Sequence, residues 1–369
     1  MNDRVWILGA TGRTGRAIAH SLDAEKVSLV LAGRDRARLA SAADELDGDP
    51  QLRVGTLQQQ LRQLEQSGAQ APAVVINTVG PFARTARQVV RACPPGTHYV
   101  DLSNELSAAQ DVLALDRAAV AGAQTFVTGA GFGVLATEAV VLRLCEGQPR
   151  PVRVRTDALA AVALQDGVVG AALAATIVEV IAAGGREVQG GRLVRAAVGG
   201  HFERITTPDG DVLSAGGGAN AELIAAWRAS GADTVIAASP AAPANPVVRA
   251  ILPAVCAVVR VPGLGRLAAA GIARIPLRAK PMPRTSSFGH ARVQWADGRE
   301  REGWLRTPDG MDFTGAVVTQ VTVRLLNGEG RSGAYTPGAL FGPELATACG
   351  GVFIDPNEAV KPALTAPTD

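Results

Sequence analysis

Short apolar runs alternate with longer segments of helical spacing over roughly the first 130 residues. The apolar runs predict buried strands, because hydrophobic side chains on both faces suit a sheet that is covered on both sides. These runs are 5–8, 27–32, 52–57, 73–77, 98–101 and 125–128. The segments between them predict helices over 16–22, 36–46, 58–66, 84–93 and 107–121. Strict alternation with short connections predicts an α/β fold built on a doubly wound parallel sheet of the Rossmann type.

The alternation is lost from Pro151 onward. Strands are expected over 152–162, within 193–207 and over 234–238, and 290–295 pairs with 302–306 as a hairpin across a short turn. Helices are expected over 135–145, 168–183, 219–227, within 247–273, over 314–326 and over 337–348. This mixture predicts a second, α+β domain whose mixed sheet carries helices on one face. We expect a Rossmann domain at 1–134, a substrate or dimerisation domain at 135–359 with C-terminal helices returning to the first domain, and a frayed tail at 360–369.

The first strand leads straight into a turn that carries three regularly spaced glycines and then into a helix. The residues of the turn with the expected binding role are Gly9, Thr11, Gly12, Arg13, Thr14 and Gly15. Glycine permits positive φ and close backbone approach, and the free N–H groups of a helix N-terminus face an anion. Glycines in this spacing are weak evidence alone, but the strand before and the helix after predict a dinucleotide pyrophosphate site.

The end of the second strand offers Arg34 where an NAD-preferring site places an acidic residue. A guanidinium there would hold a 2′-phosphate with two hydrogen bonds, so NADP(H) is the expected cofactor. Another interpretation has Arg34 and Arg36 at a solvated helix start while Asp35 binds the ribose. Arg13 reaches the same phosphate in one interpretation and points into water in the other.

Polar residues and a Gly-Pro turn follow the fourth strand. Asn77, Val79, Gly80, Pro81 and Phe82 are expected beside the ribose and diphosphate, because carboxyl ends of parallel strands meet the ligand at one edge of the sheet. A purely structural strand-to-helix turn is the alternative.

The fifth strand ends in a dense polar stretch. Tyr99, Asp101 and Glu105 are the candidate catalytic residues, since strand ends here would meet a substrate. The alternative is that Asp101, Ser103 or Asn104 caps the next helix.

Composition narrows the partners. The formal net charge is +2, and we find no dense basic block, so neither nucleic acid nor an anionic membrane is expected. The four cysteines form no C-x-x-C pair and the four histidines are scattered, which predicts a reduced cytoplasmic protein without a metal site. No uncharged apolar stretch reaches the length of an integral membrane span, and the chain enters a strand too early for a signal peptide.

Several motifs in order resemble one family. They are Gly9–Gly15, Ala32-Gly33-Arg34, Val79-Gly80-Pro81-Phe82, His98–Leu102 with Glu105, Gly131-Phe132-Gly133, Thr307–Met311 and Gly333–Pro337 with Phe341-Gly342. This set resembles the saccharopine dehydrogenase-like NADP-binding proteins, and more closely the bacterial branch that includes trans-acting enoyl reductases. The resemblance implies NADPH-dependent reduction of a C=C or C=N bond and adds Gly131 and Phe132 to the cofactor residues. It is loose over 165–280.

Three stretches depart from the family pattern. The family usually has Gly-Tyr at Gly310-Met311, Gly-Glu at Asn104-Glu105, and a Ser-Gly-Gly-Thr-like stretch where this chain has 165–170. The departures leave the small-molecule substrate open between hydrophobic, polyketide-derived and amino-acid-derived compounds.

Two classes of function compete. In a reductase the cofactor carries the hard chemistry, and Tyr99 or Asp101 is the expected proton donor. A short-chain dehydrogenase is excluded, because Tyr99 and Tyr335 are followed four residues later by Ser103 and Ala339 rather than lysine. A redox sensor that binds NADP(H) without turnover fits the glycine turn equally well. The apolar helix at 168–183 is then a partner surface, a homodimer interface or simply core.

Overall fold

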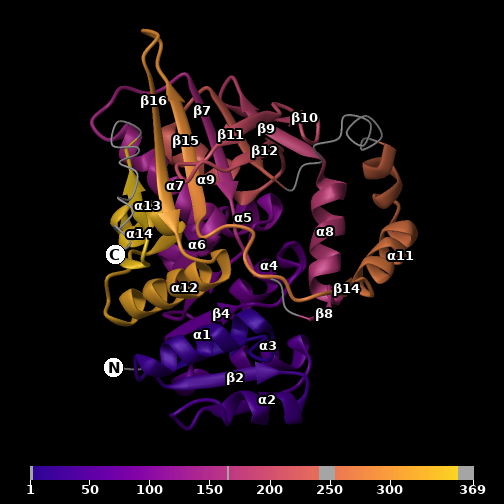
Figure 1. Ribbon diagram of the computed structural model, residues 1–369. Helices are drawn as coiled ribbons and strands as arrows, with labels where there is room; N and C mark the ends of the chain where they lie inside the picture. The colour runs from indigo at the N-terminus through magenta and orange to yellow at the C-terminus, as the bar shows by residue number, and fades with distance from the viewer. Residues whose placement is uncertain (1–2, 164–165, 241–253, 356–369) are drawn as a thin grey trace, which may run out of the picture.

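The computed structural model describes residues 3–163, 166–240 and 254–355. Its first layer is a seven-stranded parallel sheet in the order β17-β6-β5-β4-β1-β2-β3. Strands β2 and β4 of this sheet are labelled in the lower part of Figure 1. The strands are β1 (Val5–Leu8), β2 (Leu29–Gly33), β3 (Gln51–Val54), β4 (Val74–Asn77), β5 (His98–Asp101), β6 (Thr125–Val127) and β17 (Gly333–Tyr335). The doubly wound sheet predicted from the sequence is confirmed. The inner strands β1, β2 and β4 are fully buried because helices cover both faces, whereas the edge strand β3 is only half-buried.

The helices of this half follow the expected order, with one difference. They are α1 (Arg13–Ala24), α2 (Arg36–Ala43), α3 (Leu57–Glu65), α4 (Phe82–Ala92), α5 (Leu106–Leu113) and α6 (Asp116–Ala121). The single helix expected over 107–121 is therefore two. The break places Asp116, the first residue of α6, against β17, where its carboxylate accepts a hydrogen bond from the Ala334 N–H at 2.9 Å. This contact comes from a distant part of the chain, so local spacing did not reveal it.

The second layer is a mixed sheet that runs β10-β9-β13-β7-β15-β16-β18; β12 also pairs with β13, and β11 pairs with β12. Its strands are β7 (Arg153–Leu159), β9 (Gly185–Gln189), β10 (Arg192–Ala196), β11 (Glu203–Thr206), β12 (Val212–Gly217), β13 (Thr234–Ser239), β15 (Ser287–Gln294), β16 (Glu300–Thr307) and β18 (Val352–Ile354). The predicted hairpin is β15–β16.

Helices α7 (Phe132–Cys145) and α9 (Ala221–Ser230) cover one face of this sheet. Contact is close enough that a Cβ at Gly289 of β15 would collide with the backbone of Ala136 in α7. Over the opposite face the β11–β12 hairpin encloses a small second core, which includes Phe288 and Trp304 packed edge to face. The expected α+β half with helices on one face is present.

The chain then returns to the first layer. Helix α12 (Gly310–Leu326) lies against α1 and the β4–β5 region, and β17 extends the first sheet beside β6. The helix expected over 337–348 is two short helices, α13 (Pro337–Phe341) and α14 (Glu344–Ala348), because Gly342 between them has φ +77°. Strand β18 pairs with β16. The predicted tail at 360–369 lies outside the described residues.

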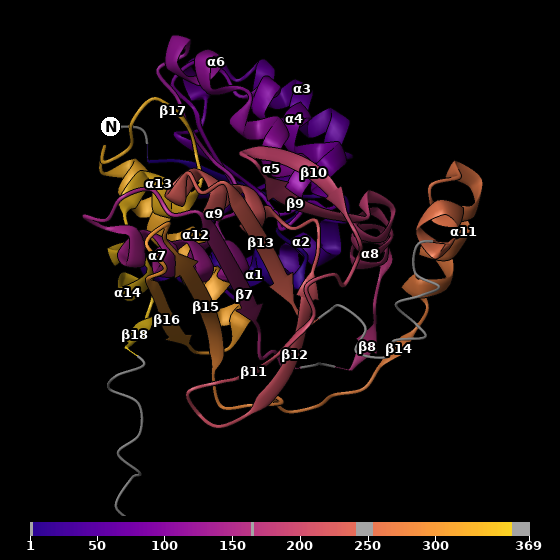
Figure 2. The same ribbon diagram turned by 90° about the horizontal axis from the view of Figure 1, so that it is seen from above.

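Two helices stand beside the main body on the side away from both termini (Figures 1 and 2). They are α8 (Ala171–Ala183) and α11 (Pro262–Ala273), which pack on each other, while the short strands β8 (Gly167–Val168) and β14 (Pro276–Leu277) pair at their base. Part of the helix expected within 247–273 lies outside the described residues. Within the described ranges, no helix combines the length and apolar character needed to cross a bilayer.

Candidate functional site

The strand order reverses between β1 and β4, because β2 flanks β1 on one side and β4 on the other. Loops that follow β1 and β4 therefore leave in opposite directions at the same edge of the sheet, which is where open α/β sheets bind ligands. The two loops touch: the Thr78 hydroxyl after β4 donates a hydrogen bond to the Leu8 carbonyl at 2.8 Å. A Cβ at Gly9 would lie 2.6 Å from the same hydroxyl oxygen.

The glycine turn after β1 requires glycine at its two ends. Gly9 has φ +83°, and a Cβ at Gly15 would lie 2.5 Å from the Gly9 carbonyl oxygen and 2.9 Å from the Ala10 Cα. Gly12, the N-cap of α1, provides no side-chain acceptor, and the first turn of α1 contains no acidic residue. Thr11 and Thr14 are half-buried, while Arg13 is exposed beside them. The turn thus presents an uncapped helix N-terminus, which suits a phosphate group.

Arginines gather at the end of β2. Asp35 is the N-cap of α2, and its carboxylate accepts a hydrogen bond from the Arg38 N–H at 3.1 Å. The Arg38 guanidinium in turn donates to the Thr11 carbonyl at 3.1 Å, which ties α2 to the glycine turn. Arg34 is exposed immediately before this helix. Sequence reasoning missed Arg38, although its spacing of four residues from Arg34 was a signal.

The turn after β4 is held by a buried asparagine. The Asn77 side-chain oxygen accepts a hydrogen bond from the Val79 N–H at 3.0 Å, and its nitrogen donates to the Tyr99 hydroxyl at 3.2 Å. The Gly80–Pro81 peptide bond is cis, and Phe82 begins α4. The expected cofactor residues of this turn therefore lie at the switch point, with Asn77 beneath them.

Tyr99 and Asp101 are joined below the same edge. The Tyr99 hydroxyl donates to the Asp101 carboxylate at 2.8 Å, and both side chains are fully buried. The other Asp101 oxygen accepts hydrogen bonds from the Ser103 N–H, the Thr128 hydroxyl and the Gly129 N–H at 2.9–3.0 Å. Burial raises the pKa of both side chains. This network binds the ends of β5 and β6 together.

Glu105 connects two helices. It is the N-cap of α5, and its carboxylate accepts hydrogen bonds from the Phe82 and Ala83 N–H groups at 3.1 and 2.7 Å, so it also caps α4. The three candidate catalytic residues are thus brought together at the predicted edge. All three are buried, and their polar atoms bond to the protein's own groups.

The loop after β6 meets α12. The Phe132 ring packs edge to face on Phe313, with ring centroids 6.2 Å apart, and the Phe132 N–H donates to the Thr314 hydroxyl at 3.0 Å. Gly131, the N-cap of α7, has no side-chain acceptor. Gly131 therefore lies in the loop after β6, while the Phe132 side chain is buried and packs on Phe313 of α12.

A buried acid that the sequence did not reveal lies where the two halves meet. Glu222, in the first turn of α9, is 3% exposed, and burial raises its pKa to about 7. Its carboxyl oxygens face the Asn104 amide, whose nitrogen lies 2.5 and 3.1 Å away when turned toward the acid. The loop after β5 is joined to this helix by the Ala221 N–H, which donates to the Asn104 carbonyl at 3.0 Å. A Cβ at Gly133 of α7 would collide with the Glu222 carboxyl group.

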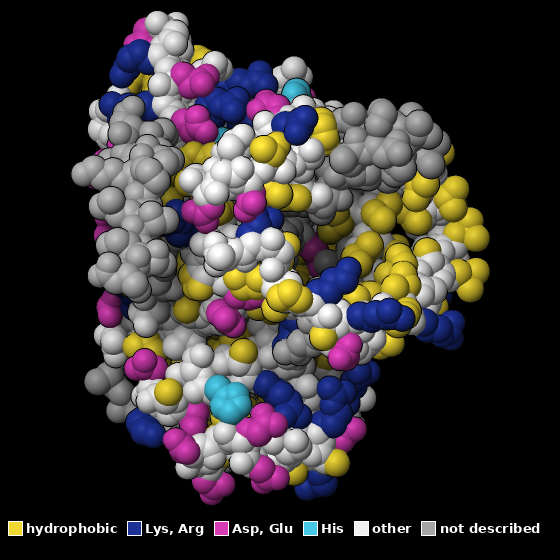
Figure 3. All heavy atoms as spheres, in the orientation of Figure 1, with side chains coloured by type: hydrophobic (Ala, Val, Ile, Leu, Met, Phe, Trp, Pro, Cys, Tyr) yellow, Lys and Arg dark blue, Asp and Glu magenta, His cyan; other side chains and the backbone are white. Residues whose placement is uncertain are grey.

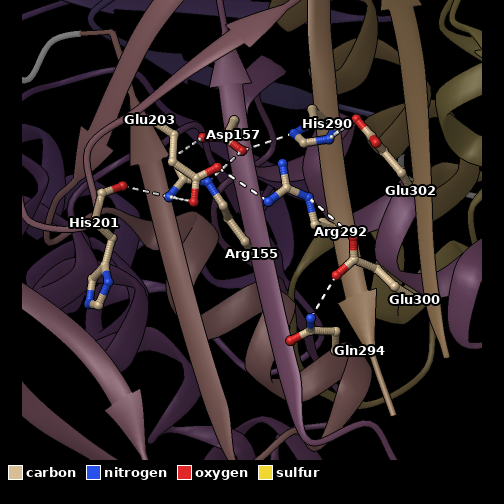
Figure 4. Close-up of polar contacts among 9 residues, drawn as sticks. All are labelled: Arg155, Asp157, His201, Glu203, His290, Arg292, Gln294, Glu300 and Glu302. Carbon is tan, nitrogen blue, oxygen red and sulfur yellow. Dashed lines mark hydrogen bonds and ion pairs between the residues drawn. The ribbon is translucent and has the colours of Figure 1, made fainter. Parts of the chain in front are cut away.

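A second polar constellation lies on the face of the mixed sheet away from α7 (Figure 4). The His290 ring is fully buried between Asp157 and Glu302, with both nitrogen–oxygen distances 2.9 Å, and it stacks on Trp304. Arg155 holds the same Asp157 with two hydrogen bonds at 2.8 and 3.1 Å. Desolvation lowers the pKa of His290, but the two carboxylates outweigh it and raise the pKa overall. These contacts make the cluster an ion-pair network around a buried His290. Among the described residues, no group of His, Cys, Asp and Glu side chains could hold a metal ion.

No protein-family model matches the sequence, and no curated protein matches it. Among solved structures, the apo saccharopine dehydrogenase (L-Glu forming) from Saccharomyces cerevisiae is similar with a TM-score of 0.58 and 13% identity, over 94% of this chain and 96% of that one. A short-chain dehydrogenase/reductase from Vibrio parahaemolyticus and a metagenomic short-chain oxidoreductase in complex with NADP have TM-scores of 0.29 and 0.31, at 15% and 14% identity. They cover 34% and 35% of this chain, and 82% and 81% of their own chains. The chain has a saccharopine dehydrogenase-like fold.

Proposed function

We propose that this protein is an NADPH-dependent reductase that acts on a C=C or C=N bond of a small molecule. The observation that carries the proposal is the glycine turn at the strand-order switch, where Gly9 and Gly15 admit no Cβ and α1 begins without an acidic cap. A backbone of this shape accommodates a pyrophosphate. The saccharopine dehydrogenase-like fold supports the same class. The ordered motif set supports it too and, within it, favours the branch of trans-acting enoyl reductases.

The residues present fit NADP(H). The pyrophosphate would lie on the N–H groups that open α1, near Thr11 and Thr14. Arg34 would bind the 2′-phosphate. Its neighbours are occupied elsewhere, since Asp35 caps α2 and the Arg38 guanidinium binds the Thr11 carbonyl, whereas Arg34 is exposed. The Val79–Phe82 turn would line the ribose and nicotinamide side, since it follows β4 on the other side of the switch point.

The cofactor would supply the hydride, the protein's own residues would orient the substrate, and a protein group or a water molecule would provide the proton that completes the reduction. Tyr99 and Asp101 would be positioning residues, because their hydrogen bonds hold the loops after β5 and β6 in fixed positions. Glu105 would position Phe82 by capping α4. Tyr99, Asp101 and Glu105 are all buried, so none of them is free to contact a substrate directly. This observation favours the second candidate function, a redox sensor that binds NADP(H) without turnover.

Cofactor titration tests the first part of the proposal. NADPH is expected to bind more tightly than NADH, and Arg34→Ala is expected to remove most of the difference, because each charge-assisted hydrogen bond to phosphate contributes about 1.5–3 kcal/mol. Arg62→Ala, an exposed arginine near the end of α3, is the matched control. Equal affinity for both cofactors in the unaltered protein would contradict the role of Arg34.

Turnover separates the two functions. Steady NADPH oxidation is expected with an unsaturated acyl compound or a cyclic imine, with Tyr99→Phe and Asp101→Asn lowering the rate. Tight NADPH binding without oxidation across a panel of both substrate classes would favour the sensor.

A further inference from the structure

The arm formed by residues 254–280, which includes α11, exposes apolar side chains that a folded protein normally buries. The exposed fractions are Val258 51%, Val261 50%, Leu264 46%, Leu267 70% and Ile275 49%. Figure 3 shows hydrophobic side chains gathered over α11, with Lys and Arg side chains at the lower end of the arm. A contiguous apolar patch of this kind marks an interaction surface.

The arm is also strongly basic. Between Asp233 and Asp297 the sequence contains no acidic residue. The arm carries five exposed cations, which are Arg260, Arg266, Arg274, Arg278 and Lys280. These five exceed the net charge of +2 of the whole chain, so the remainder of the protein is net acidic. The small total charge conceals this separation, which is why composition alone argued against an anionic partner.

The inner side of the arm is attached to the body, and among the residues that the structure describes none packs on its outer side. Helix α11 packs on α8, and the Arg260 guanidinium donates to the Ala182 carbonyl at 2.7 Å. Helix α8 is joined to the start of α4 by Arg84, which donates two hydrogen bonds to Glu179 at 2.8 and 3.1 Å. The arm is therefore held beside the turn that follows β4.

We propose that the arm seats this protein on the surface of an anionic lipid bilayer. Valine, leucine and isoleucine side chains would enter the boundary between headgroups and acyl chains, while the arginines contact lipid phosphates; this pairing is typical of interfacial helices. A second copy of the chain fits less well, because a two-fold contact through this face would bring its cations together. Nucleic acid also fits less well as the partner, because binding to it would leave the exposed leucines in water.

Vesicle co-sedimentation with the full chain tests the proposal. The protein is expected to sediment with vesicles of phosphatidylcholine mixed with phosphatidylserine, and much less with phosphatidylcholine alone, and added salt should weaken binding. The triple variant Arg266→Gln/Arg274→Gln/Arg278→Gln should weaken binding roughly a hundredfold, at about fivefold per charge. Leu264→Gln/Leu267→Gln should also release the protein.

Matched controls change the same residue types elsewhere. Arg62→Gln/Arg91→Gln/Arg117→Gln removes three exposed charges from the Rossmann half, and Val120→Gln alters an equally exposed valine at 54%. Both should bind vesicles as the unaltered protein does, and circular dichroism should show that every variant is folded.

Three outcomes would overturn the proposal. Failure to sediment with anionic vesicles would do so, as would equal losses in the arm and control variants. A concentration-dependent mass abolished by Leu264→Gln/Leu267→Gln, without vesicle binding, would assign the face to a second copy. Release from vesicles by duplex DNA, with tighter binding to the DNA, would assign it to nucleic acid.

Discussion

Replacing Glu222 with glutamine should stabilise this protein, and more so at high pH. The carboxyl group is buried at the junction of the two halves, and its pKa is about 7 instead of the ordinary 4.5. A folded-state pKa above the unfolded value means that the native state binds the proton more tightly. Stability from this group is therefore greatest at acidic pH and is lost as pH rises from about 4.5 through about 7.

The structure sets the magnitude. The difference between the two pKa values corresponds to about 3 kcal/mol of unfolding free energy above pH 7, where the buried carboxylate is ionised. Glutamine has nearly the same shape and removes this cost. Its amide also pairs with Asn104, whose amide group faces Glu222. We expect Glu222→Gln to raise the free energy of unfolding by roughly 2–3 kcal/mol at about pH 8.5, and by little at about pH 5.

Glu138→Gln is the matched control. Glu138 is buried with the same pKa of about 7, but its carboxylate accepts hydrogen bonds from the Thr336 hydroxyl and from the N–H groups of Gly338 and Ala339, which it caps at the start of α13. In Glu138→Gln the amide NH₂ group, itself a donor, would face some of these donors and lose their hydrogen bonds. This variant should therefore gain no stability at high pH. Thermal unfolding of both variants across pH measures the difference. A Glu222→Gln gain that is the same at both pH values would refute the reasoning.

Three further predictions rest on single contacts. Gly15→Ala should lower the free energy of unfolding by about 1–3 kcal/mol and weaken NADPH binding in titration, because the new Cβ would lie 2.5 Å from the Gly9 carbonyl oxygen. Gly12→Ala is the control: its Cβ would lie no closer than 3.4 Å to any atom, so this variant should fold normally. His290→Gln should lower the free energy of unfolding by about 3 kcal/mol near pH 6, and by less as pH rises through the raised pKa of His290. Thermal unfolding across pH measures this loss, and a loss that does not change with pH would contradict a charged His290 ring. Glu105→Gln should lower stability by about 1 kcal/mol through the lost cap on α4, and an unchanged melting temperature would exclude that cap as a stabilising contact.

Element type was predictable because it depends on neighbours in the sequence. The run Val5–Leu8 is apolar on both faces and became a central strand, and Gly9 to Gly15 became the turn before a helix. The β15–β16 hairpin followed from two alternating segments across a short turn. Strands β17 and β18 escaped prediction, since each has three residues and gains its partners from distant strands.

The features of the candidate site also fall into those that the local sequence determines and those that depend on the tertiary structure. The sequence by itself determined the parallel sheet, the glycine turn and the polar end of β5, because side-chain periodicity and glycine spacing are local properties. Only the tertiary structure decided that Tyr99 and Asp101 are buried partners, that Arg38 holds the turn, and that Glu222 lies against Asn104. It also brought the basic arm to one side of the molecule. Burial, pKa and charge separation depend on residues far apart in the chain, and their distances exist only once the chain has folded.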